Sequence, residues 1–60
     1  MNNTVVAQMV LAVAAELGHK RPAADVEPMV RRMLSISPSC SAVEIAGAVR
    51  DARRDAKEVR

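Results

Sequence analysis

Few side chains in this chain could perform covalent or acid–base chemistry. It has one cysteine, Cys40, and one histidine, His19. A catalytic thiol needs a positioned base, and His19 falls in a distant expected loop. One cysteine and one histidine also cannot form a four-ligand zinc site or an internal disulfide. Asp51 and Asp55 form a carboxylate pair on one helical turn, which without a histidine or a pocket indicates surface charge. We therefore expect no enzyme, no cofactor, no metal and no small-molecule substrate.

The charges near the C-terminus are sorted into two flanks of one expected helix. At ~100° per residue, the basic side chains share one flank and the acidic ones the other. Arg50/Arg54 and Asp51/Asp55 are like-charged at i, i+4, which costs a few tenths of a kcal/mol for each pair. A solvated face, pairing with another helix and contact with a phosphate backbone all remain open explanations. The basic flank comprises Arg50, Arg53, Arg54, Lys57 and Arg60, and the acidic flank comprises Glu44, Asp51, Asp55 and Glu58.

Apolar periodicity and end signals predict three helices, at about residues 4–17, 26–34 and 42–58. The chain has no Phe, Tyr or Trp, so its core must consist of Val, Leu, Ile, Met and Ala. Alanine and methionine are good helix formers and give little reason to expect a sheet. Sixty residues make one domain, residues 1–60. The predicted fold is an all-α, three-helix bundle, which could be dimeric.

The expected helix starts carry capping residues. Asn3 or Asn2 can cap the first helix, and Asp25 is a good N-cap for the second. The segment Ser41–Glu44 has the sequence of a capping box, in which the serine and the glutamate satisfy backbone N–H groups reciprocally. Gly47 lies inside the third helix, where glycine is unfavourable, so it could mark a close approach of another element.

The first helix is apolar almost all round, as expected of a helix buried on more than one side. A chain of sixty residues buries only about 60% of its unfolded surface, so a three-helix domain cannot hide that much apolar area. We expect another protein or a second copy to cover the alanine side of the first helix, or the apolar seam of the third. The predicted interface residues are Ala7, Leu11, Ala14, Ile45, Val49, Ala52, Ala56 and Val59.

A DNA-binding hypothesis rests on the end of the first helix. Ala14, Leu17 and Gly18 are similar to the start of a helix-turn-helix, although His19 stands where an aliphatic residue is usual. The match to the second helix requires a turn a few residues longer than standard. Gly18 can equally be a simple helix C-cap. In this hypothesis the contact residues are Lys20, Arg21, Arg31, Arg32, Arg50, Arg53, Arg54 and Lys57.

The apolar run Val5–Ala15 is too short to span a membrane, and no Lys or Arg precedes it as in a signal peptide. We therefore expect no membrane partner and a cytoplasmic location. The leading hypothesis is a non-enzymatic regulatory or adaptor domain that acts by protein–protein binding and self-associates. The alternative is a small helix-turn-helix-like DNA-binding regulator of phage or plasmid type, compatible with the net charge of +2.

Overall fold

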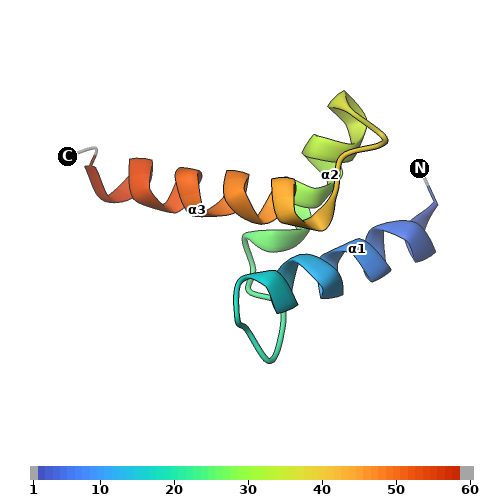
Figure 1. Cartoon of the computed structure of the whole chain (residues 1–60), viewed down its shortest axis with the longest axis horizontal. Helices are drawn as coiled ribbons and strands as arrows, with labels where there is room; N and C mark the ends of the chain where they lie inside the picture. The colour runs from blue at the N-terminus through green and yellow to red at the C-terminus, as the bar shows by residue number, and fades with distance from the viewer. Residues whose placement is uncertain (1, 59–60) are drawn as a thin grey trace.

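Three helices joined by two loops make up the computed structural model, which describes residues 2–58 except for the side chain of residue 58. The helices are α1 (Asn3–Glu16), α2 (Val26–Ile36) and α3 (Ala42–Glu58), and residues 2–58 contain no strand. Each helix packs against both of the others. The later turns of α3 extend beyond α1 and α2 (Figure 1). The prediction of an all-α, three-helix fold is confirmed.

Local capping sets where α1 and α3 begin. The Asn2 side chain accepts a hydrogen bond from the Thr4 N–H at 2.7 Å, so α1 starts one residue earlier than expected. At the start of α3, the Glu44 N–H donates to Ser41 Oγ at 3.3 Å, as the capping box predicts. The return contact differs from the prediction, because the Glu44 carboxylate accepts from the Ser41 hydroxyl at 3.5 Å. The predicted bounds of α3, at about residues 42–58, are confirmed.

Gly18 ends α1 in the left-handed backbone region, with φ of +76°. The Gly18 N–H donates to the carbonyl of Ala15 at 3.0 Å, and the His19 N–H donates to that of Ala14 at 2.9 Å. This pair of hydrogen bonds is a Schellman motif, which satisfies carbonyls that a helix end leaves free. The interpretation of Gly18 as a helix C-cap is confirmed.

Helix α2 runs two residues further than the predicted end at residue 34. The Ser37 N–H still donates to the Met33 carbonyl at 2.8 Å, so the last turn closes. Ser37 itself is extended, with φ of −141° and ψ of 96°. The following Pro38 favours that conformation, because its ring disfavours a helical residue before it. Proline therefore fixes the end of this helix more closely than the apolar pattern does.

One aliphatic face from each helix meets in a single core, and Cys40 joins it from the loop between α2 and α3. Every member is at most 8% exposed. Gly47 does not mark a close approach, because a Cβ added there would meet no atom within 4 Å. That prediction was wrong, and Gly47 is simply an unfavourable residue inside a helix. The core consists of Val6, Val10, Val13, Val26, Val30, Leu34, Cys40, Ile45, Ala46 and Val49.

None of the helices in the described part of the chain combines the length and the apolar character that crossing a bilayer would require.

Candidate interaction surfaces

Of the residues predicted to form a protein interface, some are buried inside the chain and others are exposed. Part of the α3 seam and one alanine of α1 are buried inside the chain, so they are not exposed to a partner in this structure. The third helix does have the predicted apolar seam, but the chain's own helices cover its first part, at Ile45 and Val49. The buried residues are Ala14, Ile45 and Val49; the exposed ones are Ala7, Leu11, Ala52 and Ala56; Val59 lies outside the described residues.

The side of α1 turned away from the core is exposed and uncharged. Val5 and Leu11 are 52% and 61% exposed. Over the whole of Asn3–Glu16, Glu16 in the last turn is the single charged residue. Single exposed aliphatic residues are normal on a protein, but here they lie on one helix face without a charged side chain between them. We call this surface the outer face of α1; it comprises Thr4, Val5, Ala7, Gln8, Leu11, Ala12 and Ala15.

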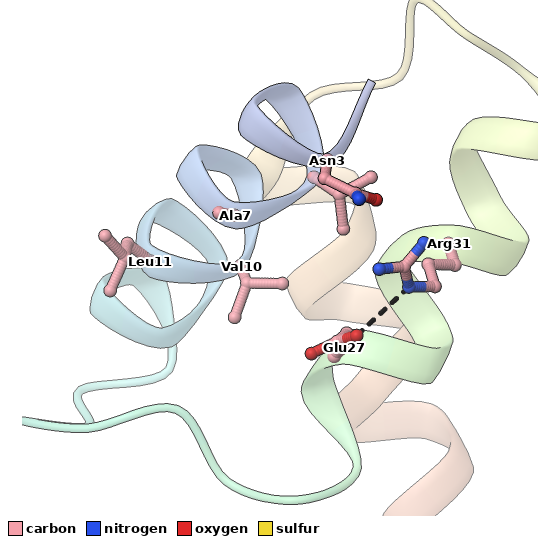
Figure 2. A pocket seen from close by; sticks show the side chains of 7 residues that line it. Asn3, Ala7, Val10, Leu11, Glu27 and Arg31 are labelled. Atoms are coloured by element: carbon pink, nitrogen blue, oxygen red, sulfur yellow. Dashed lines mark hydrogen bonds and ion pairs between the residues drawn. The ribbon is translucent and has the colours of Figure 1, made fainter. Parts of the chain in front are cut away.

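A groove of about 260 Å³ lies between α1 and α2, next to the outer face of α1. Ala7 and Leu11 belong to both surfaces. On the α2 side, the Arg31 Nε donates to the Glu27 carboxylate at 3.0 Å (Figure 2). Both side chains are about half exposed, so an i, i+4 pair of this kind contributes only about 0.3–0.5 kcal/mol. Arg31, predicted to contact DNA, thus forms an ion pair beside α1.

A bidentate ion pair joins α3 to the loop between α1 and α2. Arg53 Nε and Nη2 donate to the two carboxylate oxygens of Asp25, at 2.7 and 2.8 Å. These hydrogen bonds hold the pKa of Asp25 below its ordinary value, and they raise the pKa of Arg53. A bidentate guanidinium–carboxylate pair fixes orientation as well as distance. It therefore sets the position of the loop, residues 17–25, against α3.

This contact corrects the predicted role of Asp25. Asp25 stands at the N-cap position of α2, but its side chain makes no capping hydrogen bond. Its backbone is helical, with φ of −86° and ψ of −9°, whereas a capping residue is typically in the β region. The carboxylate instead points to the charged guanidinium of Arg53, which forms stronger hydrogen bonds than a neutral backbone N–H.

Two further contacts hold the same loop and the end of α1 against α3. Arg50 Nη2 donates to the main-chain carbonyl of Glu16 at 2.8 Å. A cation suits that position, because the last carbonyls of a helix lack partners and carry its negative dipole end. His19 Nε2 lies 3.5 Å from Arg53 Nη1, and His19 Nδ1 is buried without a hydrogen-bond partner. The end of α1 is thus held by its own Schellman motif and by α3.

Basic side chains line a second groove, of about 320 Å³, along α3. We call it the α3 basic groove; its lining residues are Arg50, Arg53, Arg54 and Lys57. Their spacing of i, i+3, i+4 and i+7 puts them on one flank of the helix. Arg54 also donates to Asp51 at 3.2 Å, in a pair that is 64% and 65% exposed.

The predicted DNA-contacting residues are not all brought together. Lys20 and Arg21 are exposed in the loop that Asp25 holds against α3. Arg31 lines the other groove, with α1, and Arg32 is exposed on α2. The connection between α1 and α2 spans residues 17–25, which is longer than the three or four residues of a helix-turn-helix.

Comparisons with protein-family models, with curated proteins and with solved structures found no match to this chain. Among the described residues, no three His, Cys, Asp or Glu side chains come together in a way that could hold a metal ion. Sequence reasoning missed the contact of Arg50 with the end of α1 and that of Arg53 with the loop. No local pattern could reveal them, because the partners are 34 and 28 residues apart.

Proposed function

We propose that this domain is a non-enzymatic protein-binding module that associates with a second copy of itself through the outer face of α1. The observation that carries the proposal is the exposure of an uncharged helix face in a chain in which 27% of residues are charged. Leu11, 61% exposed, lies near the middle of that face. Burying a leucine side chain completely contributes about 1.5–3 kcal/mol.

The composition of the face supports a second copy as its partner. In a two-fold symmetric contact the same surface meets itself, so a charge near the symmetry axis would meet the same charge of the other copy. The outer face of α1 has no charge near its middle, and Glu16 lies at its end. Its alanines also let two helix backbones approach closely, which increases the van der Waals contact per residue.

An antiparallel arrangement fits this helix best. Two-fold symmetry across the middle of α1 places Leu11 of one copy opposite Ala7 and Gln8 of the other, so a large side chain meets small or flexible ones. It also places Glu16 beside the N-terminal turn of the other copy, where a helix dipole favours an anion. At 1.5 Å per residue, α1 is about 21 Å long.

A contact limited to one such helix from each copy falls at the low end of specific interface sizes, below ~1,200 Å². The association is therefore expected to be reversible and in the micromolar range. Sedimentation equilibrium from about 10 µM to 1 mM should show a monomer–dimer equilibrium for the unmodified protein. A protein that remains monomeric at 1 mM would refute self-association.

A matched pair of substitutions tests the surface itself. Leu11→Glu buries a charge in the proposed contact and should abolish the dimer. Val43→Glu is the control, because Val43 is equally exposed, at 61%, but lies in the first turn of α3, where a carboxylate suits the helix dipole. It should dimerise normally. Far-UV circular dichroism should show that both variants are folded; dimerisation of a folded Leu11→Glu protein would exclude this face.

A further inference from the structure

The geometry of α3 points to a second binding surface, and we infer that the α3 basic groove binds the phosphate backbone of duplex DNA. This inference is independent of the self-association proposed above. It rests on how the fold arranges the cations of the groove, on where the groove lies and on the chemistry of the side chains beside it.

Arg53 lines the groove, but it is already paired with Asp25 and is therefore not counted among the phosphate contacts. Its guanidinium is held in two hydrogen bonds by the Asp25 carboxylate, which also balances its charge. Arg50 is different, because its partner is the main-chain carbonyl of Glu16, whose partial charge offsets that of the guanidinium only in part while it sets its position. A positioned cation loses less conformational entropy on binding than a free one.

Two more cations complete the surface. Lys57 forms no ion pair within the described residues. Arg54 pairs with Asp51, but both side chains are about two-thirds exposed, and such surface pairs contribute little. A phosphate can therefore replace Asp51 at small cost. Arg50, Arg54 and Lys57 together offer three phosphate contacts.

The spacing of these three cations suits a nucleic-acid strand. They follow each other at i, i+4 and i+7, and span about 10 Å along the helix at 1.5 Å per residue. Successive phosphates of one DNA strand are about 3.4 Å apart along the duplex axis, so a helix segment of this length can lie beside about four of them. The later turns of α3 extend beyond α1 and α2, so a wide duplex can approach that end of the groove (Figure 1).

The surrounding side chains favour duplex DNA over two other polyanions. Anchoring a helix in an anionic membrane needs large apolar side chains beside the cations, whereas Ala52 and Ala56 are the apolar residues exposed on the described later turns of α3. Binding to single strands relies on stacking of bases on aromatic rings, and the chain has no Phe, Tyr or Trp. A duplex requires neither feature, because its outer surface presents phosphates.

Titration of a labelled, random-sequence 20-base-pair duplex, followed by fluorescence anisotropy, tests the inference. Binding at 50 mM salt should be in the micromolar range, as for nonspecific contacts. Three phosphate contacts give a slope of about −2.7 in log affinity against log salt, so affinity should fall about 40-fold between 50 and 200 mM. Lys57→Gln should reduce the slope by about one.

Two arginine substitutions give a matched comparison. Arg54→Glu should weaken binding about tenfold or more at 50 mM salt, because it removes one charged contact and adds repulsion. Arg32→Glu changes the net charge equally at an exposed position of α2, outside the groove. It should alter affinity less than about threefold; a larger loss would mean that α2 also contacts the duplex.

The inference is overturned by any of three results: no duplex binding at 50 mM salt, an equal loss for Arg32→Glu and Arg54→Glu, or binding to vesicles containing phosphatidylserine without binding to the duplex. The Leu11→Glu protein separates this inference from self-association. It keeps the groove intact, so duplex binding by this variant would support the groove whether or not copies of the chain associate.

Discussion

The two glycines of this chain should respond in opposite ways to the same substitution. Gly18 has φ of +76° and ends α1, whereas Gly47 lies within α3 and has no such backbone conformation. At both positions an added Cβ would meet no atom within 4 Å. Gly18→Ala and Gly47→Ala therefore introduce one methyl group without a clash, and any effect on stability comes from the backbone alone.

The magnitudes follow from the two backbone conformations. A left-handed conformation costs a non-glycine residue about 1–2 kcal/mol. Replacing glycine by alanine also stabilises the fold by about 0.4–1 kcal/mol, because alanine lowers the conformational entropy of the unfolded chain. This offsets part of the cost. Gly18→Ala should thus lower the free energy of unfolding by about 1 kcal/mol. Gly47→Ala should raise it by about 0.8–1 kcal/mol, the difference in helix propensity between the two residues.

Urea unfolding followed by circular dichroism at 222 nm can measure both changes, since the chain has no tryptophan or tyrosine to report by fluorescence. For a domain of this size, 1 kcal/mol corresponds to about 4–8 °C in Tm. The two variants should therefore differ clearly, with the unmodified protein between them. Measurements at two protein concentrations would reveal any contribution from self-association, because such a contribution makes the apparent stability depend on concentration.

Either variant can refute the reasoning. A neutral or stabilising Gly18→Ala would mean that the end of α1 is not held in the Schellman motif in solution. A destabilising Gly47→Ala would mean that another surface, such as a partner, approaches α3 closely at this position.

Two further predictions concern the core and the ion pair. Ile45 is fully buried, so Ile45→Val should lower the free energy of unfolding by about 0.5–1.5 kcal/mol, and an unchanged urea midpoint would contradict the packing described. The pKa of Asp25 lies below its ordinary value of 3.8, chiefly because of the hydrogen bonds from Arg53, so its contribution to stability is complete above that pH and is lost as the pH falls through the lowered value. The unmodified protein should therefore be more stable than Asp25→Asn at pH 7, and acid unfolding titrations should show this advantage shrinking below about pH 4; an advantage that does not depend on pH would exclude the ion pair as its cause.

The ends of the helices could be predicted from the sequence because the interactions that set them are local. Asn2 caps a residue two positions away, the Ser41 hydroxyl caps one three positions away, and Gly18 needs only its own φ. Such effects depend on a few neighbouring residues. The end of α2 was predicted two residues too early because the apolar pattern stops at Leu34, whereas the helix continues until Pro38 constrains Ser37.

The sequence also determined which faces are apolar, but not what covers them. The spacing of Ile45, Val49 and Ala52 marks one seam, yet only its first part enters the core, because α3 is longer than the helices beside it. The tertiary structure alone decided that Asp25 binds Arg53 rather than capping α2, since the path of a loop brings together groups 28 residues apart. Hydrophobic periodicity and capping are properties of neighbouring residues, whereas burial and long-range ion pairing depend on how whole helices meet. For that reason the sequence determined three helices and their apolar faces, and the packing of those helices decided which of these faces and charges remain exposed.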